Sequence, residues 1–441
     1  MRLGWLVGGS LLIAAGPFVA YGCAHAEGAD EGVPYIDASD RDAREVGSSA
    51  DATRDAAADT APNADATPDA VRNEAGDATT KDAMADAPAD ASVQDANDAG
   101  DSGDAGDSGT GSGSVFVVRV GSGAATLTAA SAAVFLDEVR TIDGAVARTI
   151  SLPTAASGQN QPFTMTGIAV WEGALSVSGN GKFLTLAGYA TAPGLASVPA
   201  TTAAAVPRVV ARVDAAGNID TSTTLGGFFN TNNVRAAYTV DGTQFWVSGY
   251  DSGGGILYTT LGPNTPVQLV SAPMSGRVVT VFGGQLYCTS GSASFTGAFS
   301  VGSGLPTMVG AATTMLADSG TGGSPFGLSM LDRNPNVTGV DTIYLADDRA
   351  IGSGGGLQKW TFNGSTWSLA ATFTSGLSAG VRNVVADVTA SGVVLYVTTA
   401  ETTTRLGGFF DDGITVSPAF IPLAGAPTNT AYHGVALPPQ P

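Results

Sequence analysis

Two stretches of this chain, SVSGNGKFLTLAGY at 176–189 and AYTVDGTQFWVSGY at 237–250, repeat one pattern 61 residues apart. In both, a short apolar segment leads to Asn-Gly or Asp-Gly, the residue pairs of tight hairpin turns, and an alternating apolar segment follows. Weaker copies occur later, and the whole set aligns on Thr185, Trp246, Tyr287, Tyr344 and Tyr396. Because a repeat of about 50 residues with several strands per unit is typical of a β-propeller, the sequence predicts an all-β domain of four-stranded blades around a channel.

The number of blades follows from the strands at the two ends of the repeat region. SVFVVRVG at 114–121 has the pattern of a second strand without a first, and AYHGVAL at 431–437 that of a first strand without a second. Pairing them makes one shared blade and removes exposed strand edges, which gives a six-bladed β-propeller. A seven-bladed alternative requires a further blade within residues 124–165. The expected innermost strands, which line the channel, are 174–178, 234–240, 277–282, 326–331 and 381–388.

The composition changes sharply before the repeat domain (114–441), in residues 23–113. The whole chain has a net charge of −20, and residues 27–114 hold 22 acidic and five basic side chains among Ala, Thr, Pro and Gly. With almost no large apolar side chain to bury, this segment cannot offset its ordering entropy, so we predict a disordered acidic linker. The repeat domain lacks a basic footprint, and we therefore expect no nucleic-acid partner.

The first 22 residues have the features of an export signal peptide, with one arginine, an apolar run from Leu3 to Ala20 and a small-residue end. AYGC at 20–23 resembles a bacterial lipobox, which predicts cleavage before Cys23 and lipidation of that residue. The expected product is a lipoprotein of the cell outer membrane, attached through its lipid anchor only. The alternative is cleavage after Ala26 and free secretion. A long linker favours the anchored form, because it holds a domain away from the surface.

The repeat domain contains the stretches FVVRVG, RVVARVDAAGNIDTST, YLADD, GGGLQKW and VRNVVADV. With these stretches it resembles uncharacterised secreted β-propeller proteins of bacterial cell envelopes, and the similarity covers most of the domain. The linker after a lipobox resembles lipoproteins of Gram-negative bacteria. The likeness to NHL-type and lactonase-type propellers is one of architecture only, because no catalytic residue of those families has a matching motif here.

Few residues suited to catalysis occur in the repeat domain. Its one histidine, His433, lies in the expected closing strand and is a candidate base in the channel, the alternative being a hydrogen-bonded structural residue. Lactonase-type propellers place Glu, Asn and Asp around a central metal, and Ca²⁺ prefers such oxygen ligands. The candidates here are Glu172, Asn383 and Asp387, the last two on the same face of one strand. The competing interpretation is that polar residues at strand ends satisfy backbone groups.

Two functions remain open from the sequence. The first is a binding or scaffold module of the cell envelope, whose partner is an envelope or extracellular protein or glycan. The second is a calcium-dependent hydrolase or lyase with its site in the central channel. We favour the non-enzymatic function because no motif identifies a nucleophile or base, and the fold alone supplies no activity. Convergence of three or more carboxylate or amide oxygens at one channel end would favour the enzyme.

Overall fold

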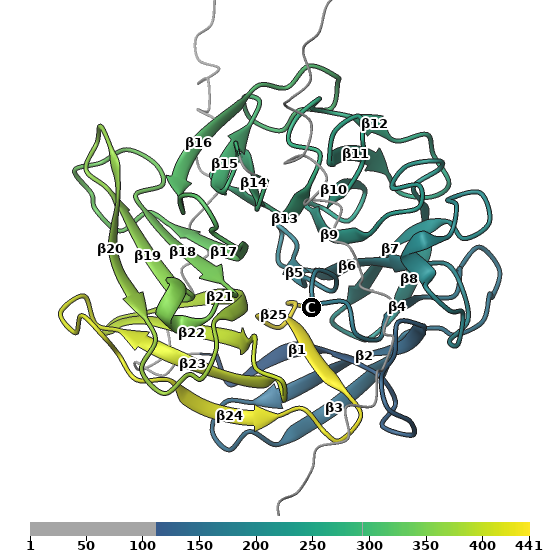
Figure 1. Ribbon diagram of the computed structural model, residues 1–441, viewed down its shortest axis with the longest axis horizontal. Coiled ribbons are helices and arrows are strands. Elements are labelled where there is room, and N and C mark those ends of the chain that lie inside the picture. Colours follow the sequence, from purple (N-terminus) through teal and green to yellow (C-terminus); the bar gives the residue numbers. More distant parts are fainter. Residues whose placement is uncertain (1–111, 293) are drawn as a thin grey trace, which may run out of the picture. The chain divides into compact units, whose positions relative to one another are not determined.

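Four of the sheets are built from consecutive sets of four strands. The computed structural model describes residues 112–292 and 294–441, all of which belong to one compact unit. In each of these antiparallel sheets the chain passes from the channel outward (Figure 1). Blade 3 contains β9 (Val234–Thr239), β10 (Gln244–Gly249), β11 (Ile256–Thr260) and β12 (Val267–Gln268); blade 4 contains β13 (Gly276–Phe282), β14 (Gln285–Ser290), β15 (Gly297–Val301) and β16 (Thr313–Asp318); blade 5 contains β17 (Pro325–Leu331), β18 (Thr342–Asp347), β19 (Gly356–Phe362) and β20 (Trp367–Phe373); blade 6 contains β21 (Val381–Thr389), β22 (Gly392–Thr399), β23 (Arg405–Asp411) and β24 (Ile421–Gly425).

Blades 1 and 2 are joined in one nine-stranded sheet. The short strand β4 (Thr164–Thr166) pairs with a strand of each blade and makes the junction. Blade 1 contains β25 (Ala431–Ala436), β1 (Ser114–Val120), β2 (Ser131–Arg140) and β3 (Val146–Ser151); blade 2 contains β5 (Ser176–Val177), β6 (Phe183–Tyr189), β7 (Arg208–Asp214) and β8 (Ile219–Thr224).

The prediction of a six-bladed propeller is confirmed, and so is its closure by strands from the two ends of the domain. β25 pairs with β1, with Val435 opposite Val117 and Tyr432 opposite Arg119. Residues 124–165, where a seventh blade was considered, instead supply β2 and β3 to blade 1. The expected innermost strands match β5, β9, β13, β17 and β21 to within two residues at each end.

Apolar side chains fill the spaces between neighbouring blades. Between blades 5 and 6, for example, Tyr344, Phe373, Leu395 and Phe409 are buried in one cluster. Strands in the middle of a blade are covered on both faces, as in β6, whereas the outer strand β3 alternates between exposed and half-buried positions. Each fully buried Leu or Phe side chain contributes about 1.5–3 kcal/mol, so this packing fixes the blades and the residues at the channel.

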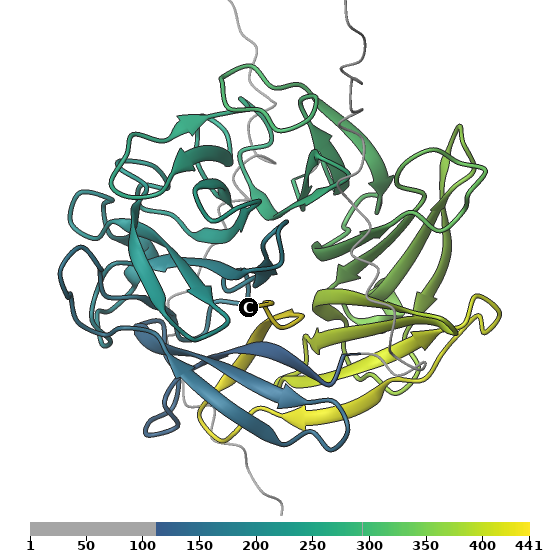
Figure 2. The same cartoon turned by 180° about the vertical axis from the view of Figure 1, so that it is seen from behind.

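The innermost strands all run in one direction, which gives the ring two distinct faces. The starts of neighbouring inner strands are bonded together, as where Arg235 of β9 donates to Ser275 just before β13. We call the face where these strands begin the entry face and the other the exit face; Figure 2 shows the ring from the opposite side. The first described residues lie at the exit face, because β1 is antiparallel to β25 and Ser112 is hydrogen-bonded to Asp387 near the end of β21.

The predictions about the N-terminal part of the chain fall outside the described residues. They concern the signal peptide at 1–22, lipidation of Cys23 and nearly all of the linker at 23–113. In the part of the chain that the structure describes, no helix is both long and apolar enough to cross a bilayer.

Candidate functional site at the channel

A β-bulge interrupts the inner strands at equivalent points near the entry face. In β9 the bulge leaves Arg235 without a directly opposite residue in β10. Equivalent irregularities lie at Arg277 in β13, at Arg382 in β21 and at His433 in β25. Because a bulge breaks the alternation of a strand, it re-aims the side chain at that point. All four side chains are thereby directed to groups of a neighbouring blade.

Four hydrogen bonds converge on the buried carboxylate of Glu172, which lies shortly before β5. Oε1 accepts from the Tyr189 hydroxyl at 2.7 Å, from Asn233 Nδ2 at 2.6 Å and from Thr166 Oγ1 at 3.0 Å. Oε2 accepts from the backbone N–H of Thr166 at 2.8 Å. Burial raises the pKa of Glu172 even though these hydrogen bonds act in the opposite direction. Since Asn233 belongs to the segment before β9, this carboxylate ties blade 2 to blade 3.

His433 makes the corresponding connection between blades 6, 1 and 2. Its Nδ1–H donates to the backbone carbonyl of Glu172 at 2.9 Å, which fixes the tautomer because a carbonyl only accepts. Its own carbonyl accepts from Asn383 Nδ2 at 3.3 Å and from the hydroxyl of Thr398. Burial, with a smaller effect from the positive charge of Arg382, lowers the pKa of His433 to about 4, so the ring is neutral at pH 7.

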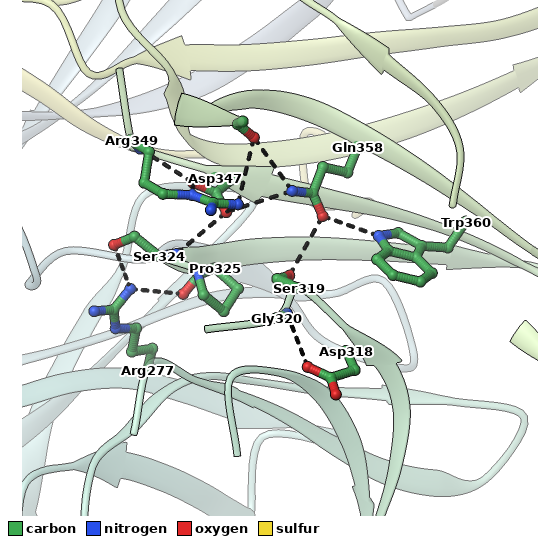
Figure 3. Close-up of polar contacts among 11 residues, drawn as sticks. Arg277, Asp318, Ser319, Gly320, Ser324, Pro325, Asp347, Arg349, Gln358 and Trp360 are labelled. Atoms are coloured by element: carbon green, nitrogen blue, oxygen red, sulfur yellow. Dashed lines mark hydrogen bonds and ion pairs between the residues drawn. The ribbon is translucent and has the colours of Figure 1, made fainter. Parts of the chain in front are cut away.

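The arginines continue these connections around the ring. Arg235 Nη1 donates to Ser275 Oγ at 2.8 Å, from blade 3 to blade 4. Arg277 Nη1 donates to Ser324 Oγ and to the carbonyl of Pro325, both at 2.9 Å, from blade 4 to blade 5 (Figure 3). In the same view the Ser324 N–H donates to Asp347 at 3.2 Å.

The ion pair between Arg382 and Asp348, at 3.6 Å, joins blade 6 to blade 5 and completes the circuit. We call this set the polar belt. Its members, which link all six blades near the entry face, are Glu172, Asn233, Arg235, Arg277, Arg382 and His433. Buried polar groups of this kind favour one arrangement, because displacing a blade leaves several of them unpaired.

A cavity of about 250 Å³ occupies the channel on the exit side of the polar belt. Its lining begins one or two residues after the belt residues of β13 and β25, at Val278 and Val435. The lining is aliphatic and hydroxyl-bearing, and no Asp, Glu, Lys, Arg or His is among its described residues. Its polar side chains are those of Ser176, Ser178, Tyr238, Thr280, Ser329 and Asn383.

The structure brings together some of the residues predicted as metal ligands and not others. Glu172, Asn383 and His433 share one network at the entry end of the channel. Asp387 lies four residues beyond Asn383, toward the exit face, and its carboxylate accepts from the backbone of Ser112. Among the described residues, no group of three or more His, Cys, Asp or Glu side chains has an arrangement that could hold a metal ion. The calcium site stays a prediction, and a cation at Glu172 would have to replace the donors already bound there.

Sequence reasoning overlooked the arginines of the polar belt. Arg235, Arg277 and Arg382 each occupy the second position of an inner strand, in VRAAY, GRVVT and VRNVV. This recurrence is visible in the sequence once the inner strands are aligned. The direction of each side chain was not visible, because it depends on a bulge.

Loops on the entry face contain residues with strained backbone conformations. Among the residues that the structure describes, four non-glycine residues have positive φ angles, at 49°, 52°, 57° and 60°, and all lie in loops on this face: Ser197, Phe229, Thr231 and Asn429. Such conformations cost about 1–3 kcal/mol each and are found preferentially at ligand-binding sites.

Comparisons with known proteins give remote structural likenesses and no sequence match. No protein-family model matches the chain, and no curated protein matches its sequence. A candidate 6-phosphogluconolactonase from Bacteroides uniformis is 15% identical, with 71% of this chain and 83% of that chain covered and a TM-score of 0.41. TolB from Acinetobacter baumannii is 14% identical, with 74% and 67% covered and a TM-score of 0.44. A chain of a nidogen/laminin complex is 10% identical, with 73% and 97% covered and a TM-score of 0.40. These likenesses concern the fold alone, and what the strand pairings themselves establish is a six-bladed β-propeller.

Proposed function

We propose that the protein is a binding or scaffold module of the bacterial cell envelope, carried on an acidic linker and attached through a lipid on Cys23. Its partner is a protein or glycan of the envelope or the extracellular space. The observation that carries the proposal is that the polar belt bonds each blade to the next. Groups that an enzyme would direct at a substrate are engaged in bonds between blades, which is the arrangement of a rigid scaffold.

The positions of the two faces also support this proposal. The described part of the chain begins at the exit face, at Ser112, so the point where the linker joins the domain does not lie on the entry face. Two exposed apolar residues, Ile168 and Leu195, lie in adjacent segments of the entry face, with exposed fractions of 58% and 37%. Their segments are adjacent because the loop before β2 bonds to both, Ala130 to Gly167 and Ser131 to Leu195. We expect the partner to contact this pair.

The anchor is tested by fractionating cells that express the wild-type chain or Cys23→Ser. We expect the wild type in the membrane fraction and Cys23→Ser outside it. Cys288→Ala serves as the matched control, because Cys288 is buried in the propeller. An unchanged distribution of Cys23→Ser would contradict the lipid anchor.

Binding is tested with the purified full chain immobilised on a sensor surface, against isolated wall glycan and against solubilised envelope protein. Retention that is lost in Ile168→Asp/Leu195→Asp and kept in Ile414→Asp would support the entry face as the binding surface. Ile414 is an apt control because it is 86% exposed and lies in the β23–β24 loop, on the exit face. Retention unchanged by the double variant would contradict this assignment.

The second candidate, a calcium-dependent hydrolase or lyase, has one observation in its favour. Glu172, Asn383 and His433 meet at one end of the channel. Calorimetric titration with Ca²⁺ distinguishes the two functions. Saturable binding that is abolished by Glu172→Gln would favour the enzyme, whereas the scaffold proposal expects no such binding.

A further inference from the structure

A second cavity, of about 310 Å³, lies between blades 5 and 6, away from the channel. It opens beside the turns that join β21 to β22 and follow β23, which places it on the exit face. We call it the inter-blade pocket. Its charged and hydroxyl-bearing lining residues include Arg333, Tyr344, Lys359, Ser391, Asp411 and Asp412.

The two carboxylates of the inter-blade pocket are already occupied by the protein's own donors. Asp411 is buried and accepts from Tyr344 OH at 2.6 Å and from the Gly413 N–H at 2.9 Å, and Lys359 Nζ pairs with it at 2.6 Å. Burial acts to raise the pKa of Asp411, but the bonds from Lys359 and Tyr344 outweigh it and hold that pKa below its ordinary value.

Asp412 is used locally by its own turn. Its carboxylate accepts from the backbone N–H groups of Ile414 and Thr415 at 2.8 and 2.6 Å, and from the Thr415 hydroxyl at 2.8 Å. Both carboxylates therefore serve as internal acceptors, and neither is arranged to receive a cation from solvent.

The inter-blade pocket has more hydrogen-bond donors than its own carboxylates use. Within the described residues, no hydrogen bond or ion pair reaches the exposed guanidinium of Arg333, which has five N–H groups. Lys359 uses its ammonium on Asp411 and retains further N–H groups. The loop that carries Arg333 is anchored, because the buried carboxylate of Asp341 accepts from the Arg333 backbone N–H at 2.9 Å.

The charge of the Arg333 guanidinium also affects the pKa of Tyr344, which lines the inter-blade pocket. Burial raises the pKa of Tyr344, and the bond to Asp411 and its charge add to that increase. The positive charge of Arg333, which lines the same pocket, opposes these effects.

We propose that the inter-blade pocket binds a small oxyanion, a carboxylate or a phosphate group, between Arg333 and Lys359. Arg333 supplies a planar pair of donors and Lys359 a point charge, the two forms of donor that bind such groups. A volume of about 310 Å³ is at the lower limit of ligand pockets, which suits a small acid or one acidic residue of a polymer. This site is independent of the entry-face function proposed above.

The test is calorimetric titration of the purified full chain with inorganic phosphate and, separately, with succinate at low ionic strength. We expect saturable binding of at least one probe and a loss of about ten-fold or more in Arg333→Ala, the effect of removing charged hydrogen bonds. Arg333→Ala should keep the melting temperature, because within the described residues the hydrogen bonds of Arg333 are made by its backbone N–H. Arg140→Ala is the matched control, since Arg140 is another half-exposed arginine of the exit face.

The two probes separate the two oxyanion types, since a phosphate site discriminates against succinate and a carboxylate site does the reverse. Equal binding by wild type and Arg333→Ala, or no binding of either probe, would overturn the proposal.

Discussion

Acidification from pH 7 to pH 4.5 should weaken the propeller by protonating His433 in the unfolded chain. This ring is neutral and buried in the closing strand β25, with a pKa lowered to about 4 from an ordinary value of 6.5. The unfolded chain therefore binds a proton at a higher pH than the folded chain does. The resulting stability is fully present above pH 6.5 and is lost as the pH falls through the interval from 6.5 to 4. Between pH 7 and pH 4.5 the free energy of unfolding should fall by about 2 kcal/mol from this group.

The measurement is urea unfolding at half-unit pH steps, with His433→Asn as the reference at every pH. Asparagine places an amide N–H near the position of Nδ1, so it can still donate to the Glu172 carbonyl, but it does not titrate. The variant should start from a lower stability because part of the ring volume is lost. Its stability should then change less than that of the wild type between pH 6.5 and 4.5.

Other groups do not obscure this comparison. Hydrogen bonds from Arg405 lower the pKa of Glu401 to about 2, and its stabilisation is lost only at lower pH. Glu172, whose pKa burial raises, contributes with the opposite sign, since its stabilisation is lost as the pH rises through its folded pKa. Both are present in wild type and variant alike. Parallel pH profiles for the two proteins would refute the assignment of His433 as a buried neutral residue.

Three further changes test other parts of the structure. Glu172→Ala leaves four buried donors without their acceptor and should lower the free energy of unfolding by about 3 kcal/mol or more in urea titrations; a loss below about 1 kcal/mol would mean that water replaces the carboxylate. Gly434→Ala would place a Cβ 2.3 Å from backbone atoms of the segment before β5. The melting temperature of this variant should therefore be well below that of Gly425→Ala, whose new Cβ would have no atom within 4 Å. Equal melting temperatures of the two variants would contradict the tight closure. Tyr344→Phe removes one buried donor to Asp411 and should lower the free energy of unfolding by about 1–2 kcal/mol. The difference from the wild type should shrink as the pH falls and Asp411 is protonated. A difference that stays constant with pH would contradict the charged hydrogen bond.

The sequence predicts the blades well because their signal is local and repeated. Turn pairs such as Asp241-Gly242 and alternating strands recur in each unit, and the incomplete units at the two ends indicate the closure. The junction strand β4 was not predicted, since three residues at 164–166 carry no pattern of their own. It forms because blades 1 and 2 lie side by side.

The candidate site was predicted less completely than the fold. Glu172, Asn383 and His433 were chosen from residue type and expected strand position, and they do share a network at one end of the channel. Their partners could not be read from the sequence, because each bond of the polar belt crosses from one blade to another. The Asn233–Glu172 bond, for example, spans 61 residues.

The position of the closing strand β25 in the sequence determines when the ring can close during synthesis. It is the last strand of the domain to be synthesised, and without it blade 1 lacks the strand that lines the channel. Until those residues arrive, β1 presents an unpaired edge on the side that β25 will cover. The ring is thus completed only once synthesis has passed β25, so its closure depends on synthesis of the whole domain.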